Sequence, residues 1–192
     1  MKNSLEIGTD TSFALNFLIY IQNIYLNQDQ NEEKLRFPYL PITVVFKDDF
    51  EIKFKELWNE IFQQIAEDNK NGVIPFYEDK DLYYEKLFVI NENSSKAFNQ
   101  IYKSFNVWWH SFAGHISVEK SVDEIGQQLY TELANLLIQK GVKPQRRLNI
   151  SLIYDNCLLA NSQITSYFSV IPIRDFFAKY KELVSKLEAC ID

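Results

Sequence analysis

Residues 11 to 27, near the N-terminus, are apolar at most positions. Asn16, Tyr20, Asn23 and Asn27 interrupt this pattern every three or four residues, so they share one narrow stripe of a helix. Such a helix must be covered on most sides. The rest of the chain can cover it, or a second copy can do so in a homo-oligomer.

Apolar residues spaced three and four apart predict four further helices. They run from Asp48 or Asp49 to about residue 70, from about residue 93 to Gly114, from Ser121 to Gly141, and from Ile173 to Leu187. Ser121 and Glu124 have the spacing of a capping box at a helix start. Gly72, Gly114 and Gly141 stand where helices commonly end, because glycine adopts the left-handed backbone conformation without strain.

Other stretches have the composition or alternation of strands. Residues 40–46 are rich in β-branched side chains, and a short strand is expected near residues 85–90. Residues 148–154 and 164–173 alternate as half-buried strands and predict a hairpin. The order of elements lacks regular βαβ units, so it predicts one α+β domain over residues 1–192. About five helices would pack on a small mixed or antiparallel sheet, with a C-terminal β-hairpin followed by a helix.

Charge and cysteine content restrict the classes of partner and the compartment. The chain of 192 residues has a net charge of −6, which disfavours nucleic acid and anionic membrane surfaces and favours a basic protein partner. Its longest apolar stretch, residues 13–26, is too short to cross a bilayer. Two isolated cysteines, Cys157 and Cys190, indicate a reducing cytoplasm. Abundant lysine, asparagine and isoleucine are typical of an AT-rich bacterial or phage genome.

The segment NVWWHSFAGHISV, residues 106–118, contains both histidines. His110 is expected on the solvent side of a helix, and His115 follows the terminating Gly114. A spacing of five places the pair on no shared face of a helix or strand, unlike a helical zinc site. We therefore predict no metal site. A sharp turn at Gly114 would, however, fold His115 back.

No residue is predicted to be catalytic and no cofactor is expected. The glycine-rich phosphate loops and the nucleophile-elbow pattern are absent from the sequence. Lys140, Lys143, Arg146 and Arg147 form a basic cluster that could bind an anion, although cations are also common where a helix ends. An enzyme or metal-binding protein remains the alternative, with a site around His110 and His115 completed by Asp155 and Cys157.

The most suggestive surface lies within residues 75–88, where aromatic and acidic residues alternate. Its predicted partner-binding residues are Tyr77, Glu78, Asp79, Asp81, Tyr83, Tyr84 and Glu85. Tyrosines are enriched at interface hot spots, and carboxylates attract a basic partner. In the alternative interpretation the aromatic side chains turn into the core. The sequence thus predicts a non-catalytic interaction module of the regulator, adaptor or immunity type.

Overall fold

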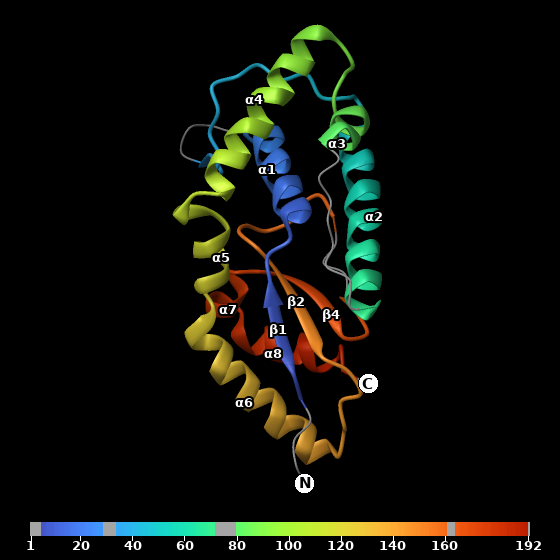
Figure 1. The fold of residues 1–192 in the computed structure, drawn as a ribbon, viewed down its shortest axis with the longest axis vertical. Helices are drawn as coiled ribbons and strands as arrows, with labels where there is room; N and C mark the ends of the chain where they lie inside the picture. Colours follow the sequence, from blue (N-terminus) through green and yellow to red (C-terminus); the bar gives the residue numbers. More distant parts are fainter. Residues whose placement is uncertain (1–4, 29–33, 72–79, 161–163, 192) are drawn as a thin grey trace.

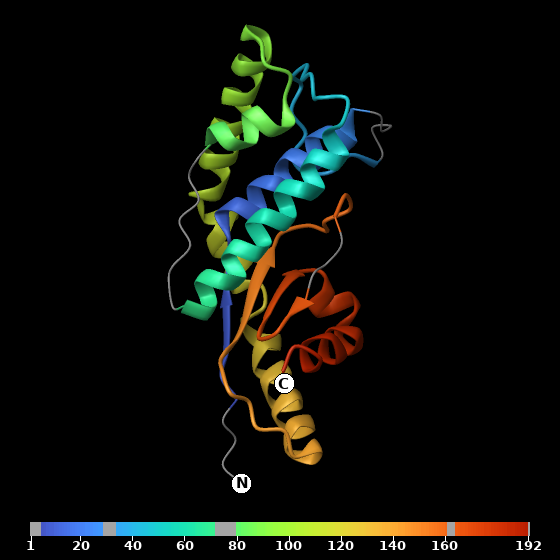
Figure 2. The ribbon, with the colours of Figure 1, turned by 90° about the vertical axis from the view of Figure 1, so that its right-hand side faces the viewer.

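The computed structural model describes residues 5–28, 34–71, 80–160 and 164–191, and it is an α+β fold (Figures 1 and 2). The helices are α1 (Phe13–Asn27), α2 (Phe50–Asn71), α3 (Lys80–Leu87), α4 (Glu92–Trp109), η2 (Phe112–Ile116), α5 (Ser117–Lys120), α6 (Asp123–Lys140), α7 (Asp175–Ala178) and α8 (Tyr180–Glu188). The strands are β1 (Ile7–Asp10), β2 (Leu148–Ile153), β3 (Ile164–Thr165) and β4 (Phe168–Pro172). The predicted class is confirmed, with more helices than the five expected.

The sheet is small and mixed, in the strand order β1-β2-β4-β3. Strands β1, β2 and β4 run parallel, and β3 pairs antiparallel with β4. The C-terminal hairpin followed by helices is therefore confirmed, as β3, β4, α7 and α8. The expected antiparallel pairing of residues 148–154 with 164–173 is wrong, since β2 pairs with β4 in parallel. An alternating pattern shows which face of a strand is buried but carries no information on the direction of its neighbour.

Helices cover both faces of the sheet, so the central strands β2 and β4 are buried on both sides. On one face, Ile153, Phe168 and Val170 belong to the core formed with α1, α2 and α4. On the other, the second core brings Leu148, Ile150, Leu152 and Ile171 against α6 and α8. The expectation of half-buried strands is wrong because Ser151 and Ser169, though polar, are also buried. Strands of parallel sheets are commonly covered in this way.

Two further strand predictions are wrong. Residues 40–45 lie outside the strands, and Phe46 forms only an isolated antiparallel bridge with Phe88. Helix α3 extends to Leu87, through the first half of the short strand expected near 85–90. Among the described residues, no strand lies beside this pair to continue a ladder. The β-branched composition therefore produces an extended segment whose Phe46 ring packs on Phe50 and Phe88.

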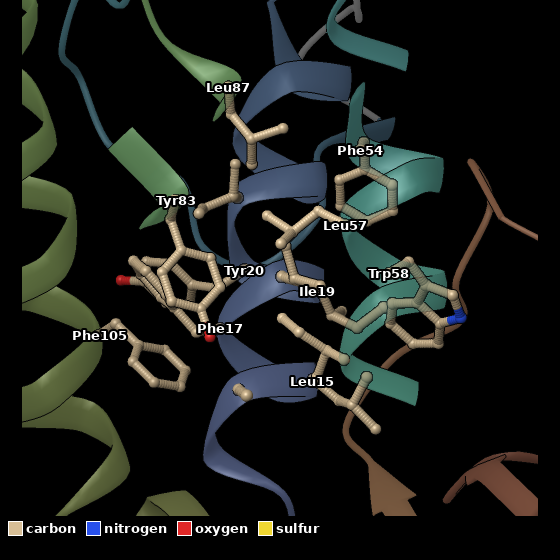
Figure 3. Close-up of a cluster of buried hydrophobic side chains, with 14 of the residues drawn as sticks. Leu15, Phe17, Ile19, Tyr20, Phe54, Leu57, Trp58, Tyr83, Leu87 and Phe105 are labelled. Atoms are coloured by element: carbon tan, nitrogen blue, oxygen red, sulfur yellow. The ribbon is translucent and has the colours of Figure 1, made fainter. Parts of the chain in front are cut away.

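Helix α1 passes through the centre of the first core (Figure 3). Every residue from Ala14 to Ile24 is buried. On one side, Leu15 and Ile19 face α2, and on the other Phe17 lies 4.9 Å from Phe105 of α4 between ring centroids. The rest of the chain thus covers this helix, and its apolar circumference does not require a second copy.

The sequence predicted the end of α6 correctly but not its start. Gly141 ends α6 in the left-handed conformation, as predicted, with a φ of 70°. The capping box is wrong, because the Ser121 hydroxyl donates to the carbonyl oxygen of Val118 and α6 begins only at Asp123. The preceding turn is already helical, since α5 ends at Lys120, and Ser121 continues it with helical backbone angles.

Candidate protein-binding groove

The polar stripe of α1 connects this helix to loops from distant parts of the chain. Asn16 binds the end of β2 at two points: its Nδ2 donates to the Leu152 carbonyl at 2.9 Å, and its Oδ1 accepts from the Tyr154 amide at 2.9 Å. Gln22, which is also buried, accepts from the amides of Leu158 and Leu159 through its Oε1. These amide side chains satisfy buried backbone groups that would otherwise lack a partner.

The same stripe holds the segment that follows residue 35. Asn23 donates through Nδ2 to the Phe37 carbonyl at 2.8 Å and to Oδ2 of Asp155 at 3.0 Å. Asn27 accepts from the Arg36 amide and donates to the carbonyls of Arg36 and Pro38. The Arg36 guanidinium completes the attachment with an ion pair to Asp155 at 3.2 Å. Residues 36–38 are therefore held from several directions, and the Phe37–Pro38 peptide bond is cis.

An open groove of about 530 Å³ lies between this segment and α4, and we call it the aromatic groove. It is lined by Tyr20, Phe37, Pro38, Tyr39, Leu40, Lys103, Ser104, Val107, Trp108 and Ser111. Several of its large apolar side chains are exposed: Phe37 by 50%, Tyr39 by 63% and Val107 by 76%. Lys103 is the charged residue among those that line it. Exposed apolar groups gathered on one surface commonly mark an interaction site.

Aromatic contacts keep the floor of the aromatic groove in place. The Phe37 ring lies 5.1 Å from that of Trp108 and 5.9 Å from that of Tyr154, measured between centroids. The Tyr20 hydroxyl donates to Oγ of Ser104 at 2.9 Å, and burial raises the pKa of Tyr20. Burial raises the pKa of Tyr154 well above its ordinary value, with the neighbouring Asp155 as a further cause. Both phenols therefore stay neutral at physiological pH.

The structure brings the two histidines together, which their spacing did not predict. The backbone kinks at Gly114, and the His115 ring lies 6.3 Å from the His110 ring between centroids. Nδ1 of His115 lies 2.8 Å from the Trp109 carbonyl, so it carries the proton that is donated. Among the described residues, no three or more His, Cys, Asp or Glu side chains are grouped as metal ligands would be. Asp155 binds Arg36 and Asn23 instead.

Only part of the predicted acidic and aromatic surface can be placed. Tyr77, Glu78 and Asp79 lie outside the described residues. Asp81 and Glu85 are exposed on α3, where a contact with a basic partner stays a prediction. Tyr83 is only 2% exposed and packs on Phe17.

Tyr84 is half-buried against Phe88 and Phe98, and its hydroxyl binds both backbone groups of Asn91. These two tyrosines turn toward the core, as the alternative interpretation expected.

The basic cluster is spread over separate contacts. Lys140 pairs with Glu188 at 2.6 Å. The Arg147 guanidinium lies over the backbone of Gly8 in β1. A Cβ atom added to Gly8 would stand 2.0 Å from this guanidinium. Lys143 and Arg146 are exposed. Anion binding by these four residues stays a prediction, and at least two of them are engaged elsewhere in the molecule.

Cys157 and Cys190 are free thiols. Burial raises the pKa of Cys157 from 9.0 to about 12, although backbone hydrogen bonds from Ala160 and Leu159 favour the thiolate. A thiol with this pKa is protonated at neutral pH and is a poor nucleophile. The structure therefore offers no support for the distant catalytic site that includes Cys157.

The raised pKa of Cys157 predicts a dependence of stability on pH. Its folded pKa lies above the ordinary value of 9.0, so its contribution to stability is complete below about pH 9 and is lost as the pH rises toward 12. Urea unfolding between pH 8 and 10.5 should show a steeper loss of stability for the wild type than for Cys157→Ala. Equal slopes for the two proteins would contradict the burial of this thiol.

The sequence singled out the stripe on α1 but missed the aromatic groove. The available signal was the segment FPYLP, residues 37–41, which places three large apolar side chains and two prolines before and at the start of the strand expected over residues 40–46. Comparisons with protein-family models, characterised proteins and solved structures found no significant match. Among the described helices, none has the length and apolar character needed to cross a bilayer.

Proposed function

We propose that this chain is a non-catalytic protein-interaction module, and that its partner inserts a bulky apolar side chain into the aromatic groove. The observation that carries the proposal is the exposure of Phe37, Tyr39 and Val107 on one surface, part of which is held by hydrogen bonds from α1. A preformed groove lowers the entropic cost of binding, because its walls are already ordered. Aromatic side chains at such sites commonly supply much of the binding free energy.

The partner of this proposal is a protein with an apolar anchor on a predominantly basic surface. The net charge of −6 attracts such a surface over long range and increases the association rate. Lys103 at the groove can donate hydrogen bonds to backbone carbonyl groups of the bound segment. The regulator, adaptor or immunity role expected from the sequence belongs to this same class of function.

Photo-crosslinking at the groove would identify the partner. Val107 is replaced by p-benzoylphenylalanine in one protein, and Ile138 of α6, which is 49% exposed, is replaced in a control. We expect a polypeptide that crosslinks from position 107 and not from position 138. The purified polypeptide is then tested directly by isothermal titration calorimetry, because capture alone does not establish a specific complex.

Val107→Asp is expected to weaken binding of the purified partner at least about thirtyfold, the effect of losing a hot-spot contact. A carboxylate placed in an apolar interface is desolvated without a partner. Ile138→Asp makes the same change on an exposed helical position outside the aromatic groove and should leave the affinity unchanged. Wild-type affinity for Val107→Asp would refute the proposal, as would a self-associated wild type that becomes monomeric in this variant.

A further inference from the structure

A second cavity, separate from the aromatic groove, lies at the carboxyl ends of the parallel strands β2 and β4. Its volume is about 230 Å³, and the last residues of the two strands, Ile153 and Pro172, both line it. The cavity is larger than the roughly 150 Å³ space that holds benzene and smaller than the roughly 300–1,000 Å³ pockets of drug-sized ligands. Its size therefore suits a small metabolite. In α/β proteins, ligands commonly bind at this end of parallel strands.

A buried hydrogen-bond donor lies at this cavity without an acceptor. Trp58 of α2 is 1% exposed and lines the cavity, and its Nε1 has no hydrogen-bond partner among the described residues. Figure 3 shows the nitrogen on the side of the indole ring that faces away from α1. Buried N–H groups nearly always have a partner, so this donor points to an acceptor atom supplied by a ligand.

Two opposite charges line the same cavity without forming an ion pair with each other. Asp175 begins α7, and Lys179 follows it by four residues. No ion pair within 4.0 Å joins either side chain to another described residue, although Asp175 also exerts an electrostatic attraction on Lys186. A ligand that carries both a positive and a negative group would match this pair. The remaining wall is mostly apolar and includes Val170 and Leu158, with Asn156 as a further polar residue.

We propose that this cavity binds a free α-amino acid with an apolar side chain. The ligand's carboxylate accepts hydrogen bonds from Nε1 of Trp58 and from the Lys179 ammonium group. Its own ammonium group pairs with Asp175, and its side chain packs against Ile153, Val170 and Pro172. This inference is independent of the proposed protein-binding function, because the aromatic groove and this cavity share no lining residue.

Titration with L-leucine tests the proposal on the intact protein. Calorimetry is expected to show saturable binding at one site, with at least tenfold weaker binding of 4-methylpentanoate and 3-methylbutylamine, which each lack one of the two charged groups. A ¹H–¹⁵N spectrum supplies a second readout, because the chain has three indole N–H groups. The Trp58 signal, identified by its absence in Trp58→Phe, should move downfield when a carboxylate accepts its proton.

Variants at the two charged positions distinguish the site from nonspecific binding. Asp175→Asn and Lys179→Gln are each expected to weaken leucine binding about tenfold or more. Lys181→Gln removes the same charge from an exposed position of α8 outside the cavity lining and should bind like the wild type. No saturable binding of any apolar amino acid by the folded wild type would overturn the proposal. The proposal would also be overturned if Asp175→Asn and Lys179→Gln both bound leucine as tightly as the wild type.

Discussion

Gly114→Ala is expected to lower the free energy of unfolding by about 2–3 kcal/mol, the upper part of the range for overpacking a closely packed site. A Cβ atom at this position would stand 2.2 Å from the Trp108 carbonyl oxygen and 2.4 Å from that of Trp109. Both atoms belong to the backbone of the last turn of α4 and cannot rotate away. The kink at Gly114 would therefore open, and the contact of His115 with the Trp109 carbonyl would be lost.

Gly126→Ala is the matched control and should change stability in the opposite direction. Gly126 lies inside α6, and a Cβ atom there meets nothing within 4 Å. Alanine lowers the conformational freedom of the unfolded chain, so it should stabilise the helix by about 0.5–1 kcal/mol. Urea unfolding of the two variants measures both effects. A Gly114→Ala protein as stable as the wild type would show that the turn after α4 packs differently.

Gln22→Met is expected to destabilise the fold by about 3 kcal/mol, although methionine has a similar size and is more apolar. The substitution removes the acceptor of the Leu158 and Leu159 amides and the donor to the Asn156 carbonyl. Each buried polar group left without a partner costs about 1–3 kcal/mol, which exceeds the gain from burying a thioether. The loop after β2 should become more accessible to hydrogen exchange at these two amides.

Gln64→Met provides the control for this prediction. Gln64 is exposed on α2, and glutamine and methionine have similar helix propensities. Its effect should stay within about 0.5 kcal/mol. If both variants unfolded at the same urea concentration as the wild type, the role of Gln22 in ordering residues 156–159 would be wrong.

The sequence predicted α1 and its polar stripe because both depend on local spacing. A period of 3.6 residues places Asn16, Asn23 and Asn27 on one side of a helix regardless of what surrounds it. The same reasoning predicted the helix that ends at Gly141, where the left-handed conformation was confirmed. It could not show that Asn23 binds the carbonyl of Phe37, since that contact depends on where a distant loop lies.

Strand direction and exposure were decided by the tertiary structure. The alternation in residues 148–153 is compatible with a parallel or an antiparallel neighbour, and only the path of the chain after β2 selects the parallel one. Tyr83 and Val107 show the same limit for single side chains: the tyrosine of an acidic segment is buried, and the valine of a helix is 76% exposed. Composition cannot predict which of these two side chains is buried, because exposure depends on which elements pack against each face of a helix.

The sequence by itself determined the helices with strong periodicity, the polar stripe of α1 and the α+β class. It also determined the net charge that the molecule presents to a partner. Only the tertiary structure decided that residues 37–40 lie beside α4 and that Trp58 lies near Asp175 and Lys179. The physical reason is the range of the interactions. Helix periods and caps arise from neighbours within a few residues, whereas a groove or cavity forms where segments far apart in the chain pack together.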